Sequence, residues 1–454
     1  MRRRPRVLDR SLTTSATHQG KIVKALVRIV HLPSNYLPES LGGTEVYVRQ
    51  LCQGLSDRGH ESAVAWHTDV PPPEEWSGPE LPVRLPPYLP QRRADLYRKA
   101  ATQEPPGFRN FLSEWQPAVL HFHAFTLGAG CGHARVAKQL NIPYVITFHT
   151  PAQSCQRGTL LRFGVEACDG QLDPVRCAAC SLHAKGWPKP AARLLSHSPL
   201  SCNWLEGPWT PRLAVKSLMS EAKDSWQEFF GGAAHIVACA EFCRDVISTN
   251  AVSAERISVH RQALPGDERQ RPLRLPIQQS GLAVKLGFFG RFAPIKGPDL
   301  FVESVRLLRA EGVNVVAELA GPIAPPDRTW AESVLARGGQ HVRHLGVLQG
   351  AHLADWLRTL DLAVLPSRCL ETGPLTLLEA WDRGTPVIGT DLGGIRDFMT
   401  AAGLSEFLFA VNAPPSIAAA VRRALAWTRP APVVTVPGVA ALAGEMEDIY
   451  RQVI

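Results

Sequence analysis

Short apolar runs alternate with amphipathic helical stretches along most of this chain, and this alternation restricts the fold more than any other feature. Residues 26–32 form an apolar run, a glycine-containing turn follows, Val48, Leu51 and Leu55 recur at helical spacing, and residues 62–66 form the next run. Strand, small-residue turn, helix and strand in this order are typical of a parallel sheet covered by helices. The sequence therefore predicts an α/β protein.

The same pattern restarts in the second half of the chain. Strands are expected at 284–289, 315–320, 362–365 and 387–389, and helices at 298–310 and 374–383. A polar segment at 265–280, rich in Pro, Gly, Gln and Arg, separates the two halves and predicts a linker. Because 454 residues are too many for one ordinary core, we expect two doubly wound, Rossmann-like domains that face a central cleft.

The boundaries of these parts follow from the same pattern. We expect a flexible basic tail at 1–22, a first domain at 23–264 with a cysteine-rich insertion at 151–215, a linker at 265–280, a second domain at 281–434 and a C-terminal helix at 435–454 that packs back on the first domain. The proline-rich residues 70–94 are expected to be irregular.

The chain is basic, with a formal net charge of +8. Its arginines are spread out, apart from the run Arg2-Arg3-Arg4, so nucleic-acid binding is not expected and the tail is a candidate for weak contact with a membrane surface. No apolar run reaches the roughly 18 residues that span a bilayer, and no apolar stretch of a secretory signal follows the basic start. We therefore expect a cytoplasmic protein, with peripheral contact at the inner face of the membrane as a further expectation.

Two cations flank a strand-to-helix turn in the second domain. Arg291 follows one expected strand and Lys296 precedes the next helix, so together they could clamp a diphosphate at the helix N-terminus. On spacing alone, two solvated surface cations account for this pair better.

A second turn opens the helix at 374–383. Gly373 lets a ligand approach the backbone closely, and Pro374 suits a first helical turn. The N–H groups available to an anion there belong to Gly373, Leu375 and Thr376. The carboxylates of Glu371 and Glu379 could reach hydroxyls of a sugar and of a ribose; the alternatives are a partner of the helix dipole for Glu371 and a solvated helix face for Glu379.

Together these motifs resemble the C-terminal domain of the retaining GT-B glycosyltransferases of family 4. The matching segments are Gly290-Arg-Phe-Ala-Pro-Ile-Lys-Gly-Pro-Asp299, Asp361-Leu-Ala-Val-Leu-Pro-Ser367, Glu371 through Glu379, and Gly384-Thr-Pro-Val-Ile-Gly-Thr-Asp391 with Gly393-Gly394. The resemblance implies a GT-B fold and transfer of a hexosyl group from a nucleotide-diphosphate sugar, with retention of configuration. Acceptors that carry a sugar, a lipid-linked group or a small molecule all stay open, and a role in polysaccharide or glycoconjugate biosynthesis is expected.

The resemblance also implies the role of single residues. Arg291 and Lys296 would hold the diphosphate, Glu371 would contact the donor sugar and Glu379 the ribose. The sequence departs from the family pattern after the first glutamate. It reads Thr372-Gly373-Pro374, where many relatives carry residues like Gly-Phe-Gly. The identity of the donor sugar therefore stays open.

On the N-terminal side the resemblance implies a glycine-rich loop at Gly42 and Gly43, near the donor phosphates and the acceptor, and a histidine, His149, beside the reacting sugar. His149 is thus the first candidate for orienting donor or acceptor, although a lone histidine at a strand end is more often structural. His121 and His123 share one face of a strand and could bind a metal jointly, but the sequence shows no third ligand close by.

Four cysteines, Cys155, Cys168, Cys177 and Cys180, lie close together in the insertion, and the last two have the spacing of a metal-binding knuckle. Four thiolates suit tetrahedral zinc, and a closed site of this kind is structural rather than catalytic. An iron–sulfur cluster and a set of reduced structural thiols are the alternatives.

The mechanism that the resemblance implies needs no bridging cation. No Asp-x-Asp motif occurs in the chain, so a catalytic divalent metal is not expected, and Arg291, Lys296 and the helix N-terminus near Gly373 would neutralise the leaving diphosphate. Two other functions stay open: a nucleotide-sugar epimerase or a phosphorylase-like enzyme of the same fold, and an inactive subunit that binds nucleotides or carbohydrates.

Overall fold

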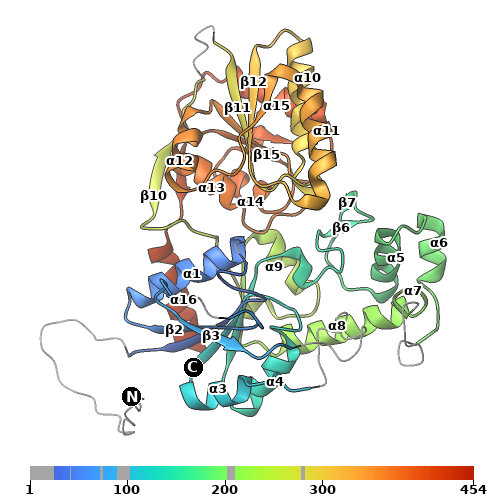
Figure 1. The fold of residues 1–454 in the computed structure, drawn as a ribbon, viewed down its shortest axis with the longest axis vertical. Coiled ribbons are helices and arrows are strands. Elements are labelled where there is room, and N and C mark those ends of the chain that lie inside the picture. The colour runs from blue at the N-terminus through green and yellow to red at the C-terminus, as the bar shows by residue number, and fades with distance from the viewer. Residues whose placement is uncertain (1–24, 41, 72–74, 89–102, 202–209, 278–281) are drawn as a thin grey trace, which may run out of the picture.

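The computed structural model describes residues 25–40, 42–71, 75–88, 103–201, 210–277 and 282–454. The expected basic tail at 1–22 lies outside these residues. Two parallel sheets, each covered by helices, are stacked one above the other along the long axis of the molecule (Figure 1). The predicted α/β architecture of two doubly wound domains is confirmed.

The N-terminal sheet has seven parallel strands in the order β3-β2-β1-β4-β5-β8-β9. Their bounds are β1 (Arg28–Leu32), β2 (Glu61–His67), β3 (Leu81–Leu85), β4 (Val119–Phe122), β5 (Tyr144–Phe148), β8 (His235–Ala238) and β9 (Ile257–Val259). The helices of this half are α1 (Gly43–Ser56), α3 (Phe108–Trp115), α4 (Cys131–Gln139), α8 (Val215–Gly231) and α9 (Glu241–Ser248).

Both faces of this sheet are buried, which explains why its central strands are continuous apolar runs. Alternate residues such as Ile29 and Val145 pack against α1 and the last helix, whereas their neighbours Val30 and Ile146 pack with residues of α3, α4 and α8. Strand β3 was not predicted, because it lies at the sheet edge within the proline-rich residues 70–94 and is only partly buried.

The C-terminal sheet has six parallel strands in the order β13-β12-β11-β14-β15-β16. Their bounds are β11 (Val284–Phe289), β12 (Val315–Ala320), β13 (Val342–His344), β14 (Leu362–Leu365), β15 (Val387–Thr390) and β16 (Leu408–Phe409). The covering helices are α10 (Pro298–Ala310), α11 (Arg328–Gly338), α12 (Gly350–Thr359), α13 (Leu375–Asp382), α14 (Gly393–Ala401) and α15 (Pro414–Leu425). The four strands predicted in this half are all present, and the two helices lie within one residue of their expected bounds.

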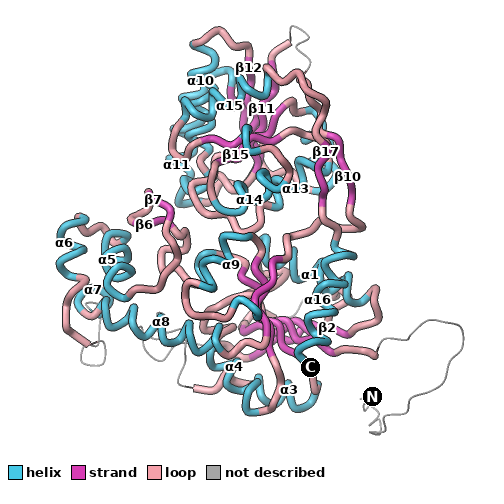
Figure 2. Tube along the Cα trace, turned by 180° about the vertical axis from the view of Figure 1, so that it is seen from behind, coloured by secondary structure: helices cyan, strands magenta, loops and turns pink. Residues whose placement is uncertain are grey.

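The two domains are joined twice. The expected linker is not wholly irregular, since it contains β10 (Arg269–Pro272), which pairs antiparallel with β17 (Val433–Val436) (Figure 2). After β17 the chain returns to the first domain as α16 (Val439–Val453), whose apolar residues share a core with α1 and the first sheet. The buried carboxylate of Glu447 on α16 accepts a hydrogen bond of 2.7 Å from Arg58 Nε.

The cysteine-rich insertion projects to one side of the N-terminal domain (Figure 1). It consists of a small hairpin, β6 (Leu161–Arg162) and β7 (Glu166–Ala167), followed by α5 (Pro174–Ala184), α6 (Lys189–Leu195) and α7 (Thr210–Leu213). Helix α5 packs on α6 and α8 through an apolar cluster that includes Ala178, Leu182 and Leu218. The insertion therefore has only a small core of its own.

Candidate active site

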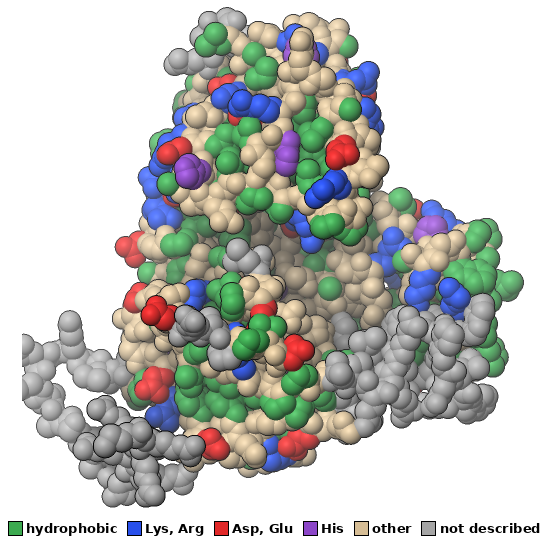
Figure 3. All heavy atoms as spheres, in the orientation of Figure 1, with side chains coloured by type: hydrophobic (Ala, Val, Ile, Leu, Met, Phe, Trp, Pro, Cys, Tyr) green, Lys and Arg blue, Asp and Glu red, His purple; other side chains and the backbone are tan. Residues whose placement is uncertain are grey.

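The molecule is hollowed between the two domains (Figure 3). A cavity of about 410 Å³ lies there, and both domains line it: α1 contributes Val46 and Gln50, and the C-terminal domain contributes Leu353, Leu375 and Glu379. The carboxyl ends of both sheets point toward this region, which is where open α/β sheets bind their ligands. Residues far apart in the sequence therefore face one interdomain space.

Lys296 and Glu371 of the C-terminal domain form a part-buried ion pair. Lys296 ends the 3₁₀ turn Pro294–Lys296 (η3), and its Nζ lies 2.5 Å from Glu371 Oε1, which also accepts a hydrogen bond of 2.6 Å from Ser367 Oγ. Burial acts to lower the pKa of Lys296, but the attraction of Glu371 outweighs it, so that pKa stands above its ordinary value. Burial acts to raise the pKa of Glu371, but Lys296 holds that pKa below its ordinary value. Both groups are charged.

A glycine brings these two turns together. Gly297 has a φ of 72°, and a Cβ there would lie 2.1 Å from the carbonyl oxygen of Pro366. Any other residue would push η3 away from the turn after β14. Arg291, which follows β11, is exposed and close enough to Lys296 for its charge to disfavour the protonated amine. The sequence-predicted cations and Glu371 therefore gather in one region.

The N-terminus of α13 closes the same region. Pro374 precedes the first residue of this helix, and the N–H groups of Leu375 and Thr376 have no partner within the helix. A Cβ on Gly43 of the first domain would lie 3.9 Å from Leu375 Cδ1, so the loop of Gly42 and Gly43 stands opposite this first turn. The backbone N–H of Gly42 donates 2.9 Å to Glu45 Oε2 and thereby caps α1.

Glu379 lies deeper along α13 and lines the interdomain cavity. Burial raises its pKa to about 7, and Arg383 offsets part of that rise. Leu353 and Gly350 of α12 line the same cavity and give it an apolar wall. A carboxylate beside an apolar wall is an arrangement that suits a ribose and its base.

His149 directly follows β5 and is buried, and its ring contacts residues of the first domain. Its Nε2 lies 3.0 Å from His123 Nδ1, and its Nδ1 lies 4.0 Å from Cys239 Sγ. Only its backbone reaches the other domain, because the carbonyl oxygen of His149 accepts a hydrogen bond from the hydroxyl of Thr372. Burial lowers the pKa of His149 to about 3, so the ring is neutral.

A third histidine, which sequence reasoning missed, lies beside His121 and His123. His31 on β1 pairs in register with His121, and its Nδ1 lies 3.0 Å from His123 Nε2. One ring nitrogen from each of the three lies within 4.8 Å of the others, so the expectation that no third ligand stands close by was wrong. The two nitrogens of His121 already contact Tyr450 Oη and Thr147 Oγ1 at 2.7 Å, which favours a hydrogen-bonded core. The available signal was a histidine within the apolar run that forms the end of the first strand.

Thr372 and Gln262 are two further residues that the sequence did not single out. Thr372 lies in the segment after Glu371 that departs from the family pattern, and it makes the interdomain hydrogen bond to His149 described above. Gln262 is buried against Gly373, where an added Cβ would lie 2.7 Å from the Gln262 Cδ, and its Oε1 has no hydrogen-bond partner among the described residues. Both side chains lie at the turn before α13, and no sequence motif marks Gln262.

A second cavity of about 410 Å³ lies on the N-terminal side. It is lined by Thr44 and Glu45 from the start of α1, by His123, and by Cys155 and Arg157 from the insertion. This cavity adjoins the glycine-rich loop, and it offers room for a second substrate. The four predicted metal ligands of the insertion, Cys155, Cys168, Cys177 and Cys180, all line one neighbouring small cavity.

In the described part of the chain, no helix combines the length and the apolar character that a bilayer crossing needs.

Two family descriptions match the chain. Residues 283–426 match the family described as "Glycosyl transferases group 1", and residues 41–170 match "Glycosyltransferase Family 4". The first covers the turns of Arg291, Lys296 and Glu371, and the second covers the glycine-rich loop and His149. Both matched segments therefore include the residues that line the interdomain space.

Relatives with curated names agree with these matches. A D-inositol 3-phosphate glycosyltransferase of Geodermatophilus obscurus is 27% identical over 411 residues, which cover 85% of this chain and 78% of that protein. The protein of the same name from Jonesia denitrificans is 36% identical over 115 residues, but that match covers only 24% of this chain and 27% of the relative. Among solved structures, Anabaena HepE in complex with UDP and glucose superposes with a TM-score of 0.54 at 13% identity, covering 94% of this chain and 98% of that one.

Proposed function

Since this chain belongs to the group 1 glycosyltransferases of the family 4 type and has the GT-B fold, we propose that it moves a sugar from a nucleotide-diphosphate sugar to a hydroxyl of its acceptor, with retention of anomeric configuration. We propose that the donor is bound by the C-terminal domain and that the acceptor enters from the N-terminal domain. The biological role would lie in polysaccharide or glycoconjugate biosynthesis.

The observation that carries this proposal is the meeting of Lys296, Arg291 and the first turn of α13 at one edge of the interdomain space. Two cations and unpaired N–H groups at a helix N-terminus form a site for a diphosphate. As the sugar leaves the diphosphate, negative charge grows on the leaving oxygen, and these fixed groups stabilise it without having to reorganise. The solved structure of HepE holds UDP and glucose, which supports a nucleotide-sugar donor for this fold.

The two glutamates would contact the other two parts of the donor, its sugar and its ribose. Glu371 holds Lys296 in place through its Oε1. Its carboxylate would contact the donor sugar that follows the diphosphate. Glu379 lines the cavity with Leu353 and would accept hydrogen bonds from ribose hydroxyls. His149 contributes through position rather than proton transfer, because its neutral ring is tied to His123 and its carbonyl to Thr372.

The proposal is tested by Lys296→Ala in the full-length chain, with binding of a panel of nucleotide sugars measured by calorimetry. Removal of the amine takes one charge from the diphosphate site and leaves Glu371 buried without its partner, so affinity should fall by at least about tenfold, or roughly 1.4 kcal/mol. Lys285→Ala is the matched control, because Lys285 lies on β11 of the same domain and faces Glu318 at 4.0 Å. Unchanged affinity in the Lys296 variant contradicts the proposal.

Measurement of turnover distinguishes a transferase from an epimerase and from an inactive binding subunit. A transferase releases free nucleoside diphosphate in proportion to acceptor consumed, whereas an epimerase converts the donor without an acceptor. Binding of nucleotide sugars with no turnover against sugar, lipid-linked and small-molecule acceptors would instead support an inactive binding subunit.

A further inference from the structure

We propose that Cys155, Cys168, Cys177 and Cys180 bind one structural zinc ion, and that this ion fixes the loop at the start of the insertion. This loop forms one wall of the second cavity described above, which is called the N-terminal cavity below. The proposal goes beyond sugar transfer and uses residues outside the donor site. It is built on the placement of the four thiols, on the contacts and charges around them, and on the short, strained hairpin beside them.

The four thiols converge from three separate segments. Cys155 follows β5 and a short turn, Cys168 follows the hairpin strand β7, and Cys177 and Cys180 lie one turn apart on α5. All four are free, and all four line one cavity of about 50 Å³. Four cysteine sulfurs around one cavity supply the donor set of a closed, tetrahedral zinc site.

A backbone N–H group points at one of these sulfurs. The N–H of Phe163 lies 3.3 Å from Cys180 Sγ. Hydrogen bonds of this type stabilise thiolates, which are the form that binds zinc.

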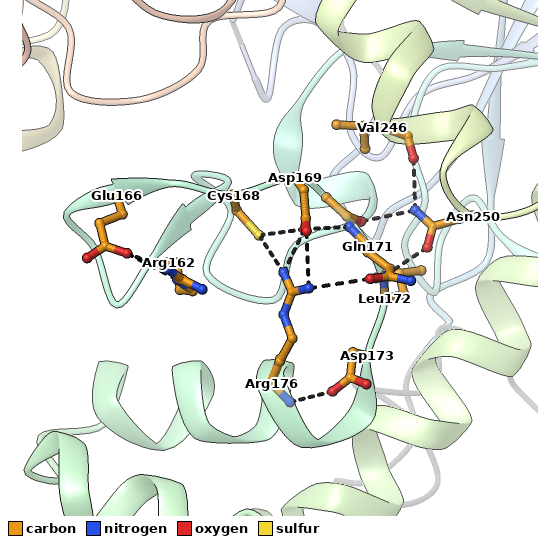
Figure 4. Close-up of polar contacts among 11 residues, drawn as sticks. Arg162, Glu166, Cys168, Asp169, Gln171, Leu172, Asp173, Arg176, Val246 and Asn250 are labelled. Atoms are coloured by element: carbon orange, nitrogen blue, oxygen red, sulfur yellow. Dashed lines mark hydrogen bonds and ion pairs between the residues drawn. The ribbon is translucent and has the colours of Figure 1, made fainter.

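Two guanidinium groups supply positive charge beside the sulfurs. Arg176 reaches from α5 toward the loop after β7, where its Nη2 lies 4.0 Å from Cys168 Sγ and 2.6 Å from Asp169 Oδ1 (Figure 4). Arg157 lines the same cavity and donates from Nη1 to the carbonyl oxygen of Cys180 at 3.4 Å. Zinc with four thiolates carries a net charge of −2, and these cations offset it.

The hairpin and α5 belong to different apolar clusters. Leu160 and Leu161 of the hairpin pack in the core of the N-terminal domain, whereas Ala178 and Leu182 of α5 pack with residues of α6 and α8. Strands β6 and β7 have two residues each, and hairpins this short are not stable by themselves. Leu160 and Phe163 adopt left-handed φ angles of 51° and 53°, which cost free energy and persist only where the surroundings impose them. A metal bound between the hairpin and α5 supplies that constraint.

Among the described residues, no three of the cysteine sulfurs all lie within 4.8 Å of one another, as the three histidine nitrogens do. With Zn–S bonds of about 2.3 Å, ligand sulfurs lie about 3.8 Å apart, so binding requires the side chains to turn inward.

The site has a direct consequence for the N-terminal cavity. Cys155, Arg157 and Gly158 line this cavity, while Cys155 and Arg157 also line the small cavity of the four thiols. A zinc ion held by Cys155 therefore fixes the loop that forms one wall of the space for the acceptor. The donor site around Lys296 shares none of these residues.

The first experiment measures metals in full-length protein purified without chelators. We expect about one zinc per chain by elemental analysis, and loss of that zinc in Cys177→Ser/Cys180→Ser. Cys131→Ser is the matched control, because Cys131 lies in the same domain on α4 and its Sγ donates to the carbonyl oxygen of Ser225, which a hydroxyl can also do. Iron with acid-labile sulfide in place of zinc, no metal at all, or alkylation-resistant disulfides among the four cysteines each overturn the zinc site.

The second experiment keeps the proposal testable if the double variant does not fold. Zinc is removed from the wild-type chain with a chelator and then restored, while thermal unfolding, thiol reactivity and steady-state kinetics are followed. On removal of zinc we expect a lower unfolding temperature and four newly reactive thiols. The KM for the acceptor should rise several-fold, while the Kd for the nucleotide sugar should not change. Addition of zinc should restore the original values. If the protein binds zinc but its removal leaves the KM for the acceptor unchanged, the role of zinc in the cavity wall is overturned. If the zinc-loaded wild type does not bind nucleotide sugars, the proposed function is contradicted instead.

Discussion

The hydroxyl of Thr372 donates a hydrogen bond to the backbone carbonyl oxygen of His149, and this bond joins the turn before α13 to the end of β5 in the other domain. Both groups are buried. The turn that carries the donor-side Glu371 is therefore held directly against the domain that would receive the acceptor.

Removal of this bond should affect catalysis more than donor binding. Thr372→Val keeps the shape of the side chain but leaves the carbonyl of His149 without its donor, so we expect kcat to fall about tenfold with little change in the Kd of the nucleotide sugar. Thr372→Ser retains a hydroxyl and should restore most of kcat. Steady-state kinetics and calorimetry on the three proteins check this, and equal kcat values for Val and Thr would show that the bond is not needed for turnover.

Donor affinity should increase as the pH rises through about 7. Burial raises the pKa of Glu379 to about 7, and only its carboxylate accepts hydrogen bonds from both ribose hydroxyls. We expect the affinity for a nucleotide sugar to rise by up to about tenfold between pH 6 and pH 8, as the ionised fraction of one group predicts. A nucleotide sugar is the right probe, because its diphosphate is esterified on both sides and does not titrate in this range. In Glu379→Gln the pH profile should be flat, and a wild-type slope that survives this substitution assigns the titration to another group.

Acid should unfold the first domain through its buried histidines. Burial lowers the pKa of His31 and His149 to about 3, while the unfolded chain takes up these protons near pH 6.5. Stability is therefore present above about pH 6.5 and is lost as the pH falls toward 3, by up to about 1.4 kcal/mol per pH unit for each such histidine.

The corresponding variant is His31→Gln, which removes one of these groups and keeps a hydrogen-bonding side chain beside His123. Urea unfolding between pH 7 and pH 5 should show a slope that is smaller by up to about 1.4 kcal/mol per pH unit than in the wild type. Parallel curves for the two proteins would mean that His31 does not resist protonation.

Glu447 should be one of the most sensitive positions of the C-terminal helix. Its buried carboxylate lies 2.7 Å from Arg58 Nε and 2.9 Å from Arg451 Nε. Glu447→Leu leaves both guanidiniums beside an apolar residue, so we expect a loss of about 3 kcal/mol in the free energy of unfolding, measured in urea. Glu445→Leu is the control, because Glu445 is half exposed and pairs only with His260 in the described contacts, and its effect should stay below about 1 kcal/mol.

The sequence predicts the buried strands well and the edge strands poorly. Strands β11 and β14 are buried on both faces, so all their residues except Lys285 are apolar or small and the runs are easily recognised. Strand β10, with the text Arg-Gln-Arg-Pro, pairs only with β17 and carries no apolar pattern. Its pairing depends on a partner more than 160 residues away, which local periodicity cannot indicate.

Part of the candidate site could likewise be predicted from the sequence, and part could not. Arg291, Lys296, Glu371 and the start of α13 are visible as residue types next to strand ends, and the structure brings them into one region. The direct ion pair of Lys296 with Glu371 was not foreseen, because it depends on how closely two turns approach at Gly297. His31 was missed for a similar reason, since only the register between β1 and β4 places it beside His121.

Helix α16 completes the core of the first domain although it is encoded at the end of the chain. The N-terminal half of the gene therefore does not specify a complete folding unit, and expression of residues before 281 alone would expose the apolar surface of α1 that Ala443 and Met446 cover. Exchange of the C-terminal half between homologous genes would replace part of the core of the first domain together with the whole second domain. Chimeras that mix donor and acceptor specificities need two crossover points, one on each side of the excised domain, near β10 and near β17.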